Sequence, residues 1–97
     1  MRVFNASSSC PVCSQGEVAF MKCDACKAFL LVCDECESIW PNPRKLVDKM
    51  SATGSYPICP RCDGKLTSKS YPTRQMIEQA DYADLIIAEK DLPIESN

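Results

Sequence analysis

The chain has 97 residues, enough for one domain with a modest hydrophobic core, and 11 basic against 13 acidic residues give it a formal net charge of −2. This length excludes a barrel or doubly wound enzyme scaffold, and the charge excludes the strongly basic balance of a general nucleic-acid binder. Eight cysteines and only one Trp, three Tyr and three Phe indicate that folding depends on the cysteines.

The N-terminal stretch 1–9 has one basic residue and no apolar run of signal-peptide length. We therefore expect a flexible N-terminus, no secretory signal, and a cytoplasmic protein whose thiols are kept reduced. The longest wholly apolar run, 28–33, is far too short to span a bilayer, so no membrane association is expected. A secreted disulfide framework is the alternative, because the cysteine count is even.

All eight cysteines fall into four Cys-x-x-Cys units, and none is left over. Two thiolates three residues apart on a tight turn reach one metal ion from the same side, and two such turns complete a tetrahedron. The absence of His excludes mixed Cys–His sites. The four units therefore predict two Zn²⁺ per chain, each held by four cysteines. The predicted metal ligands are Cys10, Cys13, Cys23, Cys26, Cys33, Cys36, Cys59 and Cys62.

The pairing of the four units is open. Nine residues follow Cys13, six follow Cys26 and 22 follow Cys36 before the next unit begins. Sequential pairing, first unit with second and third with fourth, closes the shortest loops and is favoured by chain entropy. An interleaved cross-brace is the main alternative, because 17–22 and 27–32 could form a hairpin that joins the first unit to the third. Nested pairing is the remaining possibility.

Each of two stretches contains two Cys-x-x-Cys units and ends in Leu. They are Cys10-Pro11-Val12-Cys13 to Cys23-x-x-Cys26 and Leu30, and Cys33-Asp34-Glu35-Cys36 to Cys59-Pro60-Arg61-Cys62-Asp63-Gly64-Lys65-Leu66. Together, residues 10–66 resemble a double zinc ribbon with halves 10–30 and 33–66. The resemblance implies a small metal-stabilised α+β fold with two zinc-ribbon sites and short β-hairpins. We expect each of the two leucines to cover a metal site.

The residue directly after the second Cys departs from the ribbon pattern in every unit. Ribbon knuckles usually carry Gly there, because the position favours a positive φ. In this chain the four positions hold Ser14, Lys27, Glu37 and Asp63. Since Asp alone among these residue types tolerates a positive φ comfortably, we expect the other three knuckles to be distorted.

Residues 43–50, within the long loop of the second half, are predicted to form a two-turn helix. Asn42 can cap the first amides, and Pro43 fits the first helical position. We interpret Trp40 as a cap over the zinc ribbons that anchors this helix, and a recognition aromatic is the alternative. The predicted apolar stripe of the helix is Leu46, Val47 and Met50.

The C-terminal region 67–97 is predicted to be a linker, a helix over 74–90 and an acidic tail, frayed at 94–97. Thr73 can cap the start of the helix, and a helix that continued past 90 would end before Pro93. The helix either packs on the ribbons of its own chain or forms a docking surface for another molecule, including a second copy in a homodimer. Its apolar residues, at three- and four-residue intervals with neighbours that widen the face, are Met76, Ile77, Ala80, Tyr82, Ala83, Leu85, Ile86 and Ile87.

We predict a non-catalytic protein. Without His there is no Ser-His-Asp or Cys-His arrangement, and a zinc ion with four thiolates has no open position for substrate. The favoured function is a zinc-stabilised scaffold or adaptor that binds an unknown protein partner. A nucleic-acid-binding ribbon is the alternative, disfavoured by charge, because each Zn²⁺ with four thiolates carries two further negative charges. A thiol-based redox switch that releases zinc is the lesser alternative.

Overall fold

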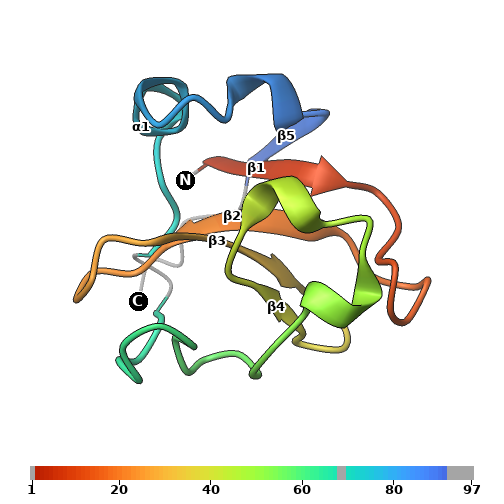
Figure 1. Cartoon of the computed structure of the whole chain (residues 1–97). Coiled ribbons are helices and arrows are strands. Elements are labelled where there is room, and N and C mark those ends of the chain that lie inside the picture. The colour runs from red at the N-terminus through yellow and green to blue at the C-terminus, as the bar shows by residue number, and fades with distance from the viewer. Residues whose placement is uncertain (1, 68–69, 92–97) are drawn as a thin grey trace, which may run out of the picture.

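A computed structural model describes residues 2–67 and 70–91. Within these ranges the chain forms a five-stranded antiparallel sheet of order β4-β3-β2-β1-β5 (Figure 1). The strands in sheet order are β4 (Ile39–Trp40), β3 (Phe29–Cys33), β2 (Val18–Lys22), β1 (Arg2–Ser7) and β5 (Ala88–Asp91). None of the helices in the described ranges is both long enough and apolar enough to cross a membrane.

The hairpin of β2 and β3 lies at the centre of the hydrophobic core. Its strands read as nearly continuous apolar runs, as expected when both faces of a sheet are covered. Because side chains alternate across a sheet, the hairpin contributes to a hydrophobic cluster on each face. The first core contains Phe4, Val18, Phe20, Leu31, Trp40 and Ile77. The second core contains Met21, Leu30, Val32, Ile39 and Leu66.

The first core is covered by α1 (Arg74–Gln79) together with two 3₁₀ turns, η1 (Pro43–Lys45) and η3 (Ala83–Leu85). Figure 1 shows α1 and the turn that follows it on one side of the sheet. Arg44 joins η1 to η3: its guanidinium donates to both carboxylate oxygens of Asp84, at 2.9 and 3.0 Å, and to the carbonyl of Asp81. The same guanidinium lies 5.5 Å from the centre of the Tyr82 ring.

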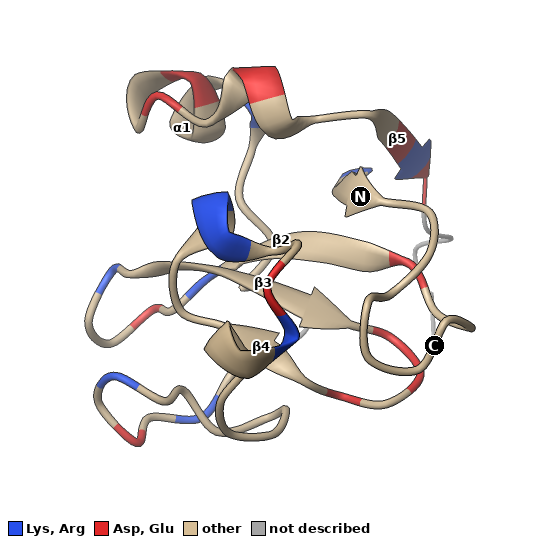
Figure 2. Ribbon diagram, turned by 45° about the vertical axis from the view of Figure 1, so that its right-hand side comes forward, with Lys and Arg blue, Asp and Glu red and all other residues tan. Residues whose placement is uncertain are grey.

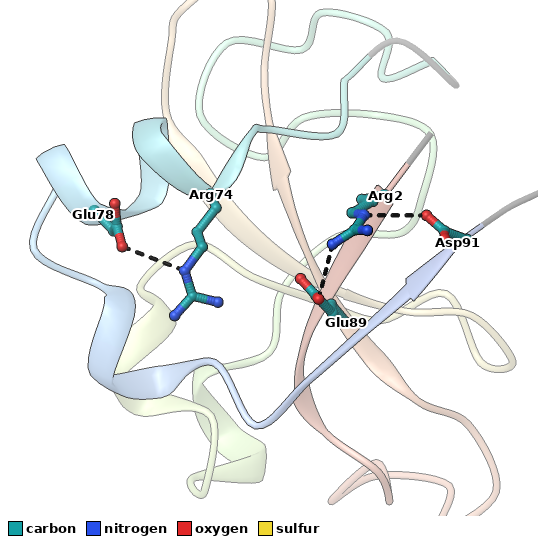
Figure 3. A network of polar contacts seen from close by, with 5 residues as sticks. All are labelled: Arg2, Arg74, Glu78, Glu89 and Asp91. Carbon is teal, nitrogen blue, oxygen red and sulfur yellow. Dashed lines mark hydrogen bonds and ion pairs between the residues drawn. The ribbon is translucent and has the colours of Figure 1, made fainter.

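Residues 2–7 form a strand, so the expectation of a flexible N-terminus over 1–9 is wrong for these residues. Strand β1 pairs with β2 on one side and with β5 on the other. Val3 and Phe4 are buried, which stabilises the strand through apolar area as well as hydrogen bonds. Figure 3 shows Arg2 of β1 between two acids of β5, with Glu89 at 2.9 Å and Asp91 at 3.3 Å.

The helix expected over 74–90 ends at Gln79. Thr73 caps its start as predicted, with Oγ1 accepting from the Met76 amide, and Arg74 pairs with Glu78 along it (Figure 3). Asp81 then takes a positive φ of 66° and turns the chain, so that Tyr82, Leu85 and Ile86 also reach the first core. The rest of the range becomes η3 and β5, because pairing with β1 satisfies the backbone groups of 88–91. The predicted frayed tail lies outside the described residues.

The helix expected over 43–50 is two separate 3₁₀ turns, η1 and η2 (Lys49–Ser51). Asn42 caps the first turn as predicted, and Asp48 caps the second by accepting from the Met50 amide at 3.0 Å. Of the expected apolar stripe only Leu46 packs against the first core, whereas Val47 and Met50 are 89% and 90% exposed. Trp40 is fully buried in the first core, which also includes Cys10 and Cys33, and it donates to the Asp48 carbonyl at 3.2 Å. Its role is thus structural, although the helix it was expected to anchor does not form.

Candidate metal centre

The eight cysteines come together as two groups of four. The first cysteine site consists of Cys10, Cys13, Cys33 and Cys36, and the second consists of Cys23, Cys26, Cys59 and Cys62. Within each site the four Sγ atoms lie within 4.8 Å of one another. The first unit thus pairs with the third and the second with the fourth, so the expected sequential pairing is wrong and the interleaved alternative is the one observed.

The β2–β3 hairpin dictates this pairing. Val18 pairs with Cys33 at one end of the hairpin, and Lys22 pairs with Phe29 at the other. A five-residue strand spans roughly 16 Å, so the first and third units meet at the open end while the second unit occupies the distant turn. Each doubling of the length of a loop adds only about 0.6 kcal/mol to the free energy of closing it. The advantage of short loops is therefore small beside the hydrogen bonds and packing of the hairpin.

The sulfur separations fit a tetrahedral metal site. The Sγ atoms of Cys10 and Cys36 are 3.7 Å apart, and the corresponding atoms of Cys23 and Cys62 are 3.6 Å apart. Four thiolates at a Zn–S distance of about 2.3 Å in a regular tetrahedron are separated by about 3.8 Å. A disulfide has an S–S distance of about 2.05 Å, and all eight thiols are free. The donor set of each site therefore fits one Zn²⁺.

The four knuckles share the ribbon geometry without glycine. The residue after the second Cys has φ of 63° at Ser14, 64° at Lys27, 63° at Glu37 and 62° at Asp63. In three units its amide donates to the carbonyl of the first Cys at 2.8 to 2.9 Å. The expected distortion of three knuckles is wrong, because closing the turn around a common centre imposes the left-handed conformation on whichever residue stands there.

Backbone amides around the sulfurs favour thiolates at one position of each site. The amides of Gln15 and Gly16 lower the pKa of Cys13 to about 6. In the second site, the amide of Cys26 is the largest influence and lowers the pKa of Cys23 to about 7. Amide donors stabilise the charged sulfur directly, so each site offers a preformed anionic ligand to a metal ion.

Four other sulfurs, those of Cys10, Cys33, Cys59 and Cys62, have a raised pKa and resist ionisation. Burial raises the pKa of Cys33 to about 12. At Cys62 the Gly64 amide lowers the pKa, but the neighbouring sulfurs outweigh it and raise the value to about 12. Four sulfurs this close cannot all carry negative charge, because like charges disfavour one another. A divalent cation supplies the missing positive charge, and its binding then displaces the protons.

Two glycines that were not predicted to matter pack closely against the sites, and Gly16 leaves no room for a side chain. A Cβ on Gly16 would lie 2.6 Å from Cys33 Sγ and 2.6 Å from Asp34 Oδ1. A Cβ on Gly64 would lie 3.1 Å from Cys62 Sγ. Their position within three residues of a second Cys was the available signal. Leu30 and Leu66 both belong to the second core, together with Cys23 and Cys59 of the second site. The expectation that each leucine covers a different metal site is therefore wrong.

The charges around the two sites differ (Figure 2). Acidic residues accompany the third unit of the chain, at Asp34, Glu35 and Glu37. The loops of the second site carry bases as well as acids. Their bases are Lys27, Arg61 and Lys65, and their acids are Asp24 and Asp63. The first site is consequently the more negative of the two.

No protein-family model, curated protein or solved structure matches the chain. The chain has a small metal-binding α+β fold of antiparallel strands and a short helix, with two four-cysteine groups that can each hold one metal ion. These groups, with their Cys-x-x-Cys spacing and room for one Zn²⁺ in each, fit a double zinc ribbon.

Proposed function

We propose that this chain is a non-catalytic zinc protein that acts as a protein–protein interaction module or adaptor. The single observation that supports the proposal is the placement of the two four-cysteine sites at opposite ends of one hairpin. Two Zn²⁺ at these positions hold the sheet rigid from both ends. Each ion takes four thiolates and keeps no open coordination position, which is typical of structural rather than catalytic zinc.

A rigid small sheet is suited to present a fixed surface to a partner, because little conformational freedom is lost on binding. Charge favours a protein partner over nucleic acid. The formal net charge is −2, and each zinc–thiolate centre adds two negative charges. Nucleic-acid binding is driven mainly by neutralisation of phosphates with Lys and Arg, which an acidic protein supplies poorly.

The experiment uses the zinc-loaded protein and its Cys59→Ser variant as baits. Each bait is cross-linked to proteins of the host cell, and the proteins recovered with it are quantified. We expect a defined set of proteins to be recovered with the zinc-loaded bait and lost with the variant, whose second site is incomplete. Retention on heparin or single-stranded DNA is measured in parallel. Tight retention that falls steeply with salt, without protein partners, would overturn the proposal in favour of a nucleic-acid-binding ribbon.

A further inference from the structure

One face of the sheet is covered over only part of its area. Leu66 is part of the second core on this face, and Tyr56 and Tyr71 pack against that core. Toward the first site, a cavity of about 220 Å³ opens over the sheet, and a hollow of about 130 Å³ adjoins it. We call the two together the acidic groove. It is lined by Val3, Asn5, Glu17, Ala19, Met21, Val32, Cys33, Asp34, Glu37, Tyr56, Tyr71 and Lys90.

Carboxylates dominate the polar lining of the groove. Glu17 is already engaged, accepting from the Asn5 side chain at 2.7 Å and pairing with Lys90 at 3.5 Å. Asp34 accepts the Glu17 amide through Oδ1 at 2.9 Å, which leaves its second oxygen available. The Glu37 carboxylate makes no hydrogen bond or ion pair within residues 2–67 and 70–91. Among the described lining residues Lys90 is the single base, so the groove is net negative.

Two aromatic rings complete the wall beside these acids. Tyr71 is half-buried, and its pKa is raised by burial and by the proximity of Tyr56 and Asp34. Both rings and the Asp34 carboxylate therefore border the same space. Aromatic faces attract cations, and the floor of Ala19, Met21 and Val32 is suited to the methylene stem of a long side chain.

We propose that the acidic groove binds an arginine side chain presented by a partner protein, an assignment that rests on the proposed protein-binding function. A guanidinium is planar, so it can lie against a tyrosine ring while its N–H groups reach the carboxylates of Glu37 and Asp34. The larger hollow is smaller than the roughly 300–1,000 Å³ of sites for drug-sized molecules, but one extended side chain fits it. Cys33 also lines the groove, so a metal-loaded first site adds negative charge beside it.

The test is an NMR titration of the isotope-labelled, zinc-loaded full chain. The probe is the peptide acetyl-Gly-Gly-Arg-Gly-Gly-amide, and its citrulline counterpart has nearly the same shape without the charge. We expect saturable shifts of the Ala19, Val32 and Glu37 amides with the arginine peptide. The citrulline peptide, lacking the charge, should bind roughly tenfold more weakly or not at all.

Glu37→Gln removes the free carboxylate and should weaken arginine binding roughly tenfold. Glu35→Gln is the matched control, because it removes the same charge from the same knuckle but lies outside the groove lining, and it should leave binding unchanged. Glu37→Gly is a second variant that removes the carboxylate while favouring the positive φ of this position. The zinc content and the amide spectrum of each variant are measured to check that the fold is intact.

Three results would overturn the assignment: equal binding of the citrulline peptide, equal binding of a lysine peptide, or equal effects of Glu35→Gln and Glu37→Gln. No arginine binding, together with protein partners in the cross-linking experiment that survive Glu37→Gln, would refute the groove and leave the proposed function standing. Loss of those partners with Glu37→Gln and not with Glu35→Gln would support both.

Discussion

At the scale of single residues, the four left-handed positions after the second cysteines carry the clearest information. Their side chains are Ser, Lys, Glu and Asp, and each keeps a φ near 63°. An L-residue in this conformation costs about 1–2 kcal/mol. The knuckles adopt it regardless, so the demand of four converging sulfurs exceeds this local cost.

Lys27 is a position at which glycine should relieve that cost. Its side chain is exposed and its φ is 64°, so we expect Lys27→Gly to raise the free energy of unfolding by about 1 kcal/mol. The measurement is denaturant unfolding at fixed free zinc. The control is Lys65→Gly, at an exposed position without a positive φ, which should lower the same quantity by roughly 0.5–1 kcal/mol. Equal losses in the two variants would contradict the account of the knuckle.

The identity of the candidate ligands could be predicted from the sequence, whereas the backbone around them could not. Cys-x-x-Cys spacing is local, so it identifies all eight sulfurs without knowledge of the fold. The conformation of Ser14, Lys27 and Glu37 is instead set by a partner unit far along the chain, and residue preference alone indicates the opposite. The tight approach at Gly16 has the same origin, because the sulfur it meets is that of Cys33 at the end of β3.

At the scale of elements, tertiary pairing decides what the C-terminal region becomes. The apolar periodicity of 74–90 is real, since Ile77, Tyr82, Leu85 and Ile86 all reach the first core. Ile77 does so from α1, and the other three do so from η3 and its flanking residues. Residues 88–91 are exposed and pair with β1 as a strand instead of continuing the helix. The sequence offered the hairpin of β2 and β3 only as an alternative, over 17–22 and 27–32, and the strands form close to those bounds.

The contribution of α1 can be measured at Ile77, which is fully buried in the first core. Removing its side chain beyond Cβ leaves a cavity, so we expect Ile77→Ala to lower the free energy of unfolding by about 2–5 kcal/mol. Gln79→Ala, at an exposed position of the same helix, should change it by less than about 0.5 kcal/mol. Similar small losses in both variants would mean that α1 does not pack on this core in solution.

At the scale of the whole molecule, two metal sites stabilise opposite ends of one small sheet. Structural zinc contributes roughly 10–16 kcal/mol of binding free energy, whereas a domain has a net stability of only about 5–15 kcal/mol. Loss of the metal should therefore unfold the molecule as a unit. We expect excess chelator at neutral pH to abolish the near-ultraviolet circular dichroism of Trp40, which is fully buried.

Acid should have the same effect by proton competition. Zinc requires thiolates, and in the metal-free sites Cys33 and Cys62 hold their protons up to a pKa of about 12. Protonation thus opposes metal binding at every pH below that range, so zinc affinity rises with pH and is lost on acidification. Titration with a zinc indicator between neutral and acid pH measures this. A fold that persists after all zinc is released would contradict the stabilising role of the metal.

The pairing of the cysteines is a property of the whole molecule, and for that reason the sequence left it open. Loop entropy favoured neighbours by a small margin, while the observed pairing depends on the register in which Val18 meets Cys33. The hairpin considered at 17–22 and 27–32 is close to the strands that form, so the sequence contained the correct alternative.

Native mass spectrometry of two double variants tests this pairing most directly, with zinc counted in the presence of a weak chelator. Cys10→Ser with Cys36→Ser removes two ligands from the first site only, so we expect one Zn²⁺ to remain. Cys10→Ser with Cys26→Ser removes one ligand from each site, so we expect none. The reverse result, no zinc in the first variant and one in the second, would show sequential pairing and contradict the interleaved double site.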